Sequence, residues 1–280
     1  MARAKTSRWR ILGHRLSLAG ARAASLCLPC PTACVPVEVM GLRFESALGI
    51  AAGYDRLGTL GRRAGALGFG FNEIGSTAPG GISALRRSSG SAQLGINLTL
   101  DAARSLSETG AGLAQAWHMA DYLMLNLIGP ASAPLLESAQ RQRLRVLLAE
   151  LREQQFLLNE EGGRHVPLAV KIRSLPGQVP LHLAELLLEL GYDGLLAAHD
   201  PGPPATRQRY RTWQAESQQS QACQQIAALR ALTGNDIALM SVGGIQTRQH
   251  FTARLDAGAE LVQAHTALLH RGPWLPSLLL

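Results

Sequence analysis

Lys171 is the residue of this sequence that most needs a chemical explanation. Of the 27 lysine and arginine residues, only Lys5 and Lys171 are lysines. Lys171 follows the apolar run at residues 167–170, so its ammonium group is expected inside a buried strand, where charged side chains are rare unless they are paired or functional. Such a group could stabilise negative charge on a reduced flavin. The alternative interpretation is a lysine that is paired with a buried carboxylate.

Asn97 and Asn126 are further candidates, because each follows apolar residues of a predicted strand. An asparagine side chain offers both a hydrogen-bond donor and an acceptor. It therefore suits the edge of a flavin or pyrimidine ring, along which N–H and C=O groups alternate. The competing interpretation is an asparagine that caps a helix or braces a loop.

Gly243 and Gly244 form a candidate phosphate site. Glycines let backbone N–H groups approach an anion closely, and a helix expected to begin near Thr247 would direct the positive end of its dipole to the same place. The alternative is a glycine pair that is needed only for a tight turn between a strand and a helix.

The elements that must position these residues are eight short apolar strands. Their runs of Ile, Leu and Val lack strict alternation, as expected of strands buried on both faces. The predicted strands occupy residues 47–52, 70–74, 94–98, 122–127, 166–172, 194–198, 237–242 and 261–264. Helical patterns lie at residues 57–67, 102–116, 135–158, 181–190, 218–232 and 247–257, and Gly191, Gly234 and Gly258 stand at expected helix ends.

This alternation predicts an α/β fold, a (β/α)8 TIM barrel, with its active site at the C-terminal ends of the strands. Residues 76–92 show no full helix, and the polar stretch at residues 200–217 is a candidate flap over the site. The strand ends add these candidates: Ala52, Gly53, Arg56, Ser76, His199, Asp200, His265 and Thr266.

Positive charge is concentrated at the N-terminus. The formal net charge is +7, but 6 of the 27 basic residues and none of the 20 acidic residues lie in the first 37 positions. The rest is nearly neutral, which argues against a nucleic-acid-binding body. We therefore divide the chain into a short basic N-terminal extension, residues 1–36, and a barrel, residues 37–280. The extension fits a peripheral membrane helix, an organelle transit peptide or a loose basic tail.

Other chemistry finds little support in the sequence. Cys27, Cys30 and Cys34 lie close together, but no fourth ligand is nearby, so no metal site is predicted. No hydrolase or nucleotide-binding motif is present. No apolar run reaches the length of about 18 residues that a membrane-spanning helix needs.

Several motifs, taken in order, resemble the membrane-associated, quinone-using dihydroorotate dehydrogenases. Residues 40–56 resemble the first strand of that family, and residues 166–172, with the sequence Val-Pro-Leu-Ala-Val-Lys-Ile, closely resemble its fifth. Shorter matches at residues 68–76, 94–97, 191–194, 241–245 and 258–263 extend the resemblance from Val37 to about Pro273.

The resemblance implies FMN as cofactor, dihydroorotate as substrate and a quinone as electron acceptor, in pyrimidine biosynthesis. Its implied FMN contacts are Ala52, Gly53, Ser76, Asn97, Asn126, Lys171, Gly243, Gly244 and Thr266. Asn126 is an implied substrate contact, and Arg56 and His199, which stand where the family has a lysine and an asparagine, are the further candidates for substrate binding. The basic extension would correspond to the part of the family that faces the membrane. The implied location is therefore the cytoplasm, at the inner membrane, or the mitochondrion if the source is eukaryotic.

The sequence departs from the family at the catalytic loop. Gly129 stands where the family has its catalytic serine, and Ala131 replaces a substrate-binding asparagine. Loss of a positioned base typically costs about 10²- to 10⁴-fold in rate. Ser132, which lies three residues past Gly129, and the pair His199 and Asp200 are the candidate substitutes.

Three hypotheses follow from these residues. The first is a dihydroorotate dehydrogenase-like flavoprotein in which Lys171, Asn126 and Ser132 are the catalytic residues. The second is a catalytically degenerate barrel that acts as a binding or scaffold module. The third is an FMN reductase with a different substrate, for which His199 and Asp200 would supply acid–base chemistry.

Overall fold

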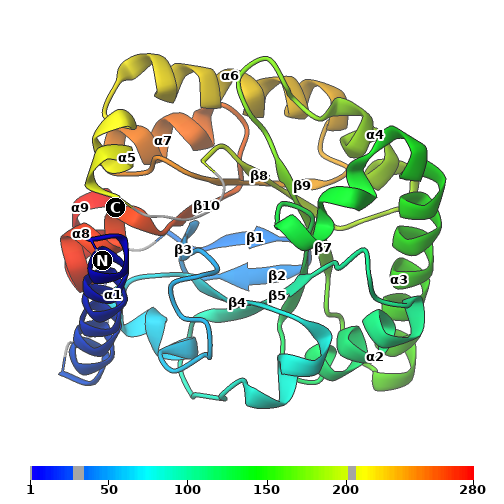
Figure 1. The fold of residues 1–280 in the computed structure, drawn as a ribbon, viewed down its shortest axis with the longest axis horizontal. Coiled ribbons are helices and arrows are strands. Elements are labelled where there is room, and N and C mark those ends of the chain that lie inside the picture. Colours follow the sequence, from blue (N-terminus) through cyan, green and yellow to red (C-terminus); the bar gives the residue numbers. More distant parts are fainter. Residues whose placement is uncertain (1, 28–34, 201–205) are drawn as a thin grey trace.

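Eight parallel strands close into a barrel, as the sequence predicts (Figure 1). The computed structural model describes residues 2–27, 35–200 and 206–280. The strands follow the closed order β10-β3-β4-β5-β6-β7-β8-β9. They are β3 (Leu48–Ile50), β4 (Phe71–Thr77), β5 (Gln93–Thr99), β6 (Tyr122–Asn126), β7 (Leu168–Arg173), β8 (Gly194–Ala198), β9 (Ala238–Val242) and β10 (Leu261–Ala264). Each strand overlaps its predicted range, because a buried apolar run is a strong local signal.

Helices surround the barrel (Figure 1). They include α2 (Leu106–Trp117), α3 (Arg141–Gly162), α4 (Leu181–Glu189), α5 (Arg207–Thr212), α6 (Glu216–Thr233), α7 (Arg248–Asp256), α8 (Thr266–Arg271) and α9 (Leu275–Leu279). Gly191, Gly234 and Gly258, predicted at helix ends, follow α4, α6 and α7 with positive φ angles of 69°, 56° and 108°. The predicted flap at residues 200–217 contains α5, and its residues 201–205 lie outside the described residues.

The first part of the barrel differs from the prediction. Residues 57–67 were expected to be a helix, but only Gly61–Leu67 is helical, and it is a 3₁₀ helix, η1. The buried carboxylate of Asp55 accepts hydrogen bonds from the backbone N–H groups of Thr59, Leu60 and Gly61, which fixes the preceding residues as a turn. Between β4 and β5 there is likewise only a 3₁₀ helix, η2 (Pro79–Ala84).

The N-terminal extension is not a loose tail, because Ala2–Cys27 forms one helix, α1. It packs against η1, against α8 and against the 3₁₀ turn η5 (Gly272–Trp274). Ala21 is fully buried in that contact, and His14 Nε2 donates to the Tyr54 carbonyl oxygen at 2.8 Å. The helix therefore covers the side of the barrel where the chain supplies the 3₁₀ helices η1 and η5 and the short α-helix α8. None of the described helices is both long and apolar enough to cross a membrane.

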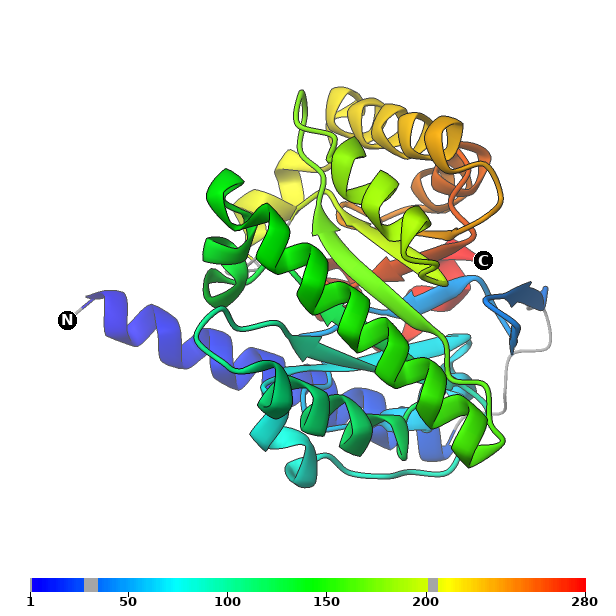
Figure 2. The same ribbon diagram turned by 90° about the vertical axis from the view of Figure 1, so that its right-hand side faces the viewer.

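A two-stranded hairpin covers the N-terminal end of the barrel. It consists of β1 (Val37–Val39) and β2 (Leu42–Phe44), and the Met40 carbonyl at its turn contacts His165 Nε2 at 3.0 Å, just before β7. Figure 2 shows the hairpin at one end of the barrel and the N-terminal end of α1 projecting past the other end. The end with the C-terminal ends of the strands is therefore the one next to the start of α1.

Candidate active site

A chain of polar side chains crosses the barrel strands near their C-terminal ends. The Asn126 amide of β6 donates to Ser76 Oγ at 2.8 Å and to Asn97 Oδ1 at 3.2 Å. The Asn97 amide of β5 donates in turn to Glu73 Oε1 at 2.7 Å. Lys171 of β7 lies near the same carboxylate oxygen, with 3.7 Å between Nζ and Oε1. The structure thus brings together Ser76, Asn97, Asn126 and Lys171, which the sequence had marked separately.

Glu73 is the residue at the centre of this network, and the sequence reasoning did not mark it as a site residue. Its carboxylate is fully buried and also accepts hydrogen bonds from Gln263 Nε2 at 2.6 Å and from the Tyr122 hydroxyl at 3.4 Å. Burial raises the pKa of Tyr122, and the neighbouring Glu73 charge raises it further, so the phenol stays protonated. An acidic residue inside the apolar run at residues 69–74 was the signal that could have identified Glu73.

The pairing of Lys171 with Glu73 corresponds to the alternative interpretation of this lysine. It leaves the other interpretation open, because Lys171 belongs to the same hydrogen-bonded network as Ser76, which is exposed at the end of the barrel. Asn97 and Glu73 are fully buried, Lys171 is 5% exposed, Asn126 is 7% exposed, and Ser76 is exposed. The network therefore runs from the interior of the barrel to its surface.

The loop after β3 lies against the end of β10. The backbone N–H of Gly53 donates to the Gly75 carbonyl at 2.7 Å, and a Cβ atom at Gly53 would lie 3.5 Å from His265 Nε2. Burial, together with the charges of His14, Lys171 and Arg56, lowers the pKa of His265 to about 4, although a hydrogen bond with Gly53 opposes the shift. His265 is therefore neutral at pH 7 and lies in the positive field of Lys171 and Arg56.

The two glycines after β9 form a tight, closely packed turn. Gly243 and Gly244 have φ angles of 118° and 78°, a region that L side chains rarely adopt. A Cβ atom at Gly244 would lie 2.1 Å from the Trp213 ring, and one at Gly243 would lie 2.8 Å from the Asp200 backbone nitrogen. These contacts account for both glycines as turn residues. The phosphate-binding role of Gly243, Gly244 and Thr266 remains a prediction.

The side chains of His199 and Ser132 form no hydrogen bond with the side chains of Ser76, Asn97, Asn126 or Lys171. His199 Nδ1 is 2.7 Å from Gln225 Oε1 of α6, and Nε2 is 3.2 Å from Ser241 Oγ, so the ring is held on the helix side of β8. Burial, together with the charge of Arg254, lowers the pKa of His199 to about 3, so the ring is neutral at pH 7. The fully buried Ser132 hydroxyl contacts only the carbonyl oxygens of Leu100 and Asn126.

Neither Ser132 nor Asp200 has the surroundings of a catalytic base. The Ser132 hydroxyl has no titratable neighbour to take its proton, and Asp200 is paired with Arg209. The roles of Ser132, His199 and Asp200 in catalysis or substrate binding remain predictions that this geometry does not favour. Among the described residues no cluster of histidine, cysteine and acidic side chains could hold a metal ion. Cys30 and Cys34 lie outside the described residues, and Cys27 is exposed.

Comparison with known proteins decides the family. The family model of dihydroorotate dehydrogenase matches residues 215–279. A Chromobacterium violaceum protein named dihydroorotate dehydrogenase (quinone) is 31% identical, in an alignment that covers 93% of this chain and 86% of that protein. A Cellvibrio japonicus protein with the same name is 30% identical over 93% of this chain and 87% of its own length.

This chain belongs to the dihydroorotate dehydrogenase family. Solved structures agree on the fold. The Eimeria tenella DHODH in complex with ferulenol superimposes with a TM-score of 0.77 and 21% identity, covering 96% of this chain and 89% of that one. The ligand-free Eimeria tenella enzyme gives a TM-score of 0.74. The (β/α)8 fold and the family resemblance that the sequence indicated are both confirmed.

Members of the dihydroorotate dehydrogenase family depend on flavin, and the network at the strand ends fits the ring of such a cofactor. The Lys171 ammonium can donate to a ring edge, whereas the amides of Asn97 and Asn126 would have to exchange their present hydrogen bonds for bonds to the ring. Gln263 Oε1 is buried without a hydrogen-bond partner among the described residues, so one acceptor of the network is free to bond to a ligand. The predicted phosphate site at Gly243 and Gly244 shows no such fit, because Trp213 packs directly on Gly244.

The family resemblance predicts that Gly129 stands at the position of the catalytic serine, and the structure shows the surroundings of this residue. Gly129 has an extended backbone, with φ −75° and ψ 160°, just before the 3₁₀ helix η3 (Pro130–Leu136). A Cβ atom there would meet only Thr99 Cγ2, at 4.0 Å. Serine would therefore fit at this position without strain. The loop keeps the space for the family's base but lacks its hydroxyl group.

Proposed function

We propose that this protein binds FMN and oxidises dihydroorotate to orotate, with a quinone as electron acceptor. The observation that carries the proposal is the network of Ser76, Asn126, Asn97, Glu73 and Lys171, which supplies donors, acceptors and one positive charge at the end of the barrel where such sites lie. The choice of dihydroorotate as substrate and of a quinone as acceptor rests on the relatives named dihydroorotate dehydrogenase (quinone).

FMN would supply the redox chemistry, by accepting a hydride from C6 of dihydroorotate and passing two electrons to the quinone. The Lys171 ammonium would stabilise negative charge on the cofactor, and Glu73 fixes the position of that ammonium. Asn97 and Asn126 would orient the ring edges of cofactor and substrate through their amides. Ala52 and Gly53 would line the cofactor from the loop after β3, and Arg56 would attract the substrate carboxylate.

The proton on C5 of the substrate must leave as the hydride leaves C6. No side chain is available at residue 129 to take it, because that residue is glycine. Water would have to accept this proton, so we expect oxidation at a rate reduced by about 10²- to 10⁴-fold relative to a protein with the base. The geometry of Ser132 offers no replacement, because its hydroxyl faces backbone carbonyls.

Helix α1 would place the protein at a membrane surface, where quinones dissolve. Ile11, Leu12 and Leu16 of α1 are 52%, 45% and 64% exposed, and basic residues accompany them along the helix. A helix with exposed apolar and basic side chains is typical of interfacial binding. The location proposed is therefore cytoplasmic and peripheral on the inner membrane, or mitochondrial in a eukaryotic source.

The test is an absorbance spectrum of the purified protein, before and after dihydroorotate is added. Flavin bands near roughly 370 and 450 nm that bleach slowly with dihydroorotate and return with a quinone are the expected result. Flavin bands that dihydroorotate never bleaches would contradict the reaction and favour a different substrate. A colourless protein that takes up no added FMN would contradict the whole proposal.

A second candidate function is a binding or scaffold module without catalysis. Two observations favour it, namely the glycine at residue 129 and the packing of Trp213 on Gly244 at the expected phosphate site. Complementation of a strain that requires pyrimidines separates the two functions. Growth restored by the folded protein supports the dehydrogenase, and failure of well-expressed protein to restore growth supports the module.

A further inference from the structure

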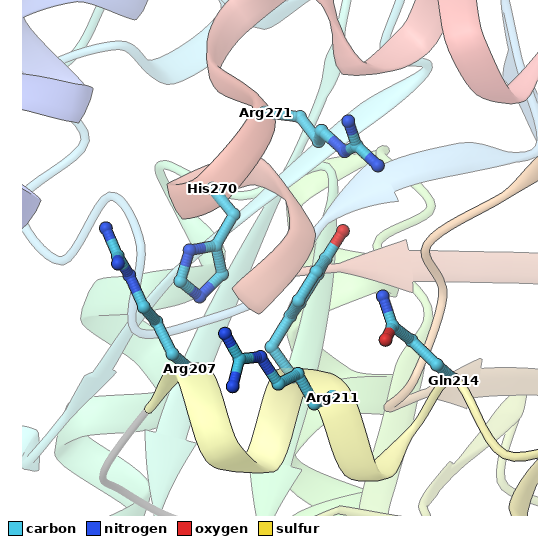
Figure 3. Close-up of a pocket in the computed structure, with 6 residues that line it drawn as sticks. Arg207, Arg211, Gln214, His270 and Arg271 are labelled. Carbon is cyan, nitrogen blue, oxygen red and sulfur yellow. The ribbon is translucent and has the colours of Figure 1, made fainter.

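A basic pocket lies between α5 and α8, on residues that the proposed function does not use. It has a volume of about 350 Å³. Its lining consists of Arg207, Tyr210, Arg211, Gln214, His270 and Arg271. Figure 3 shows Arg207 and Arg211 extending from α5 toward α8, from which His270 points back at them. Two elements that follow different strands, β8 and β10, thus contribute to one cationic site.

The positive charge of this pocket is not balanced by acidic residues. Within the described residues, no carboxylate forms an ion pair with Arg207, Arg211 or Arg271. Arginines elsewhere do pair with acids, as Arg62 does with Asp121 and Arg230 with Glu260. Because the body of the protein is nearly neutral, three such arginines around one pocket are a local excess of charge.

His270 and Tyr210, the aromatic residues of the pocket, also indicate an excess of positive charge and an unused hydrogen-bond donor. Burial lowers the pKa of His270, and the charges of Arg207 and Arg271 lower it further, which indicates a positive potential at the imidazole. The Tyr210 ring packs against that imidazole with 4.5 Å between centroids. The Tyr210 hydroxyl is buried and has no hydrogen-bond partner among the described residues. The pocket therefore holds both unbalanced cations and an unused hydroxyl donor.

The element that carries most of the pocket is fixed to the barrel. The Thr206 hydroxyl caps α5 by accepting from the backbone N–H of Arg209, and the Arg209 side chain pairs with Asp200. Gln246, in the loop after β9, donates from Nε2 to the Tyr210 carbonyl at 2.5 Å. These contacts hold α5 against the barrel, so Arg207 and Arg211 project from a preorganised support.

We propose that this pocket binds the phosphate group of a small phosphorylated ligand, at a site separate from the flavin. Guanidinium groups bind oxyanions through two parallel hydrogen bonds, and a phosphate monoester carries up to two negative charges, whereas a carboxylate carries one. Three arginines therefore match phosphate better than carboxylate. The volume exceeds what a single phosphate needs, so the ligand is a phosphorylated metabolite or a phospholipid headgroup.

The test is calorimetric titration of the full chain with inorganic pyrophosphate at low ionic strength, where exposed charges are least screened. The expected result is saturable binding that the double variant R207Q/R271Q weakens by about 10- to 100-fold, because charge-assisted hydrogen bonds are lost. Arg141→Gln is the matched control. Arg141 is an exposed arginine at the start of α3, outside the pocket, so its substitution should leave the affinity unchanged.

Two further arms identify the source of the phosphate. Glycerol 3-phosphate represents a soluble ligand, and vesicles that contain phosphatidic acid represent a lipid headgroup. The ligand whose affinity falls more in R207Q/R271Q, relative to the wild type, identifies the source. Equal pyrophosphate affinity in wild type and R207Q/R271Q would overturn the proposal, as would equal losses in R207Q/R271Q and R141Q. Competition between FMN and pyrophosphate would also overturn it, because the site would then be that of the flavin.

Discussion

Glu73 and Lys171 form a buried ion pair inside the barrel, with 3.7 Å between the carboxylate Oε1 and the ammonium Nζ. The carboxylate side chain is fully buried, and the lysine side chain is 7% exposed. Each charge therefore depends on the other, since neither has free access to water. The position of the candidate catalytic lysine on β7 is thus set by a residue of β4, and β5 and β6 lie between these two strands in the barrel.

Removal of the carboxylate tests this dependence. Glu73→Gln keeps the side-chain shape but leaves the Lys171 ammonium without a counterion, so we expect a loss of about 3–5 kcal/mol in the free energy of unfolding. Urea denaturation measures the loss. Glu153→Gln, which changes an exposed acid on α3, is the control and should change stability by less than about 0.5 kcal/mol. A double variant E73Q/K171M should recover part of the loss, because no charge stays unpaired. If E73Q were as stable as the wild type, Glu73 would not be supporting Lys171.

Restoration of the family's serine tests the proposed reaction. Gly129→Ser fits the available space, because a Cβ atom there meets only Thr99 Cγ2 at 4.0 Å. The new hydroxyl would be in place to take the C5 proton, so we expect dihydroorotate oxidation to rise by about 10²-fold or more. Gly129→Ala adds the same Cβ without a hydroxyl and should leave the rate unchanged. Flavin bleaching in a stopped-flow spectrometer provides the rate. Equal rates in G129S and G129A would show that the rest of the substrate pocket is also lost.

The contact of Trp213 with Gly244 tests the role of the glycine turn. Gly244→Ala should destabilise the protein by about 2–4 kcal/mol, because the new Cβ meets the Trp213 ring and the positive φ is strained. In a Trp213→Ala background only the backbone strain remains, so the cost should fall to about 1–2 kcal/mol. Thermal unfolding of the four proteins completes the cycle. Flavin titration of the same set separates the roles, since a phosphate site predicts weaker FMN binding by G244A in both backgrounds. Additive stability losses would refute the steric coupling.

The strands could be predicted from sequence because each is a buried apolar run whose signal is local. For residues 2–27 a helix was only one of three interpretations, because α1 is stabilised by its contact with η1, α8 and η5, which lie far away along the chain. The site residues also divide into those with a local sequence signal and those placed by long-range contacts. Asn97, Asn126 and Lys171 were found at strand ends, whereas the place of His199 on the helix side of β8 depends on Gln225 of α6. Trp213 could not be placed on Gly244 either, because nothing local links them.

His199 gives the protein a predictable response to acid. Burial lowers the pKa of the folded-state imidazole to about 3, whereas the unfolded chain has the ordinary value of about 6.5. Between pH 6.5 and pH 3, His199 is therefore protonated in the unfolded state and neutral in the folded state. Stability from this residue is complete above that pH and falls toward pH 3, with a limiting slope of about 1.4 kcal/mol per pH unit.

Substitution of His199 isolates this contribution. His199→Gln removes the titrating group and keeps an amide that can bond to Gln225 and Ser241. Between pH 6.5 and pH 4.5 the free energy of unfolding should fall by about 2–3 kcal/mol less in this variant than in the wild type. His118→Gln is the control, because His118 is exposed and should leave the pH profile unchanged. Urea denaturation at each pH yields the two profiles. Parallel profiles for wild type and H199Q would mean that His199 is protonated in the folded protein, which would reopen its role as an acid in the substrate site.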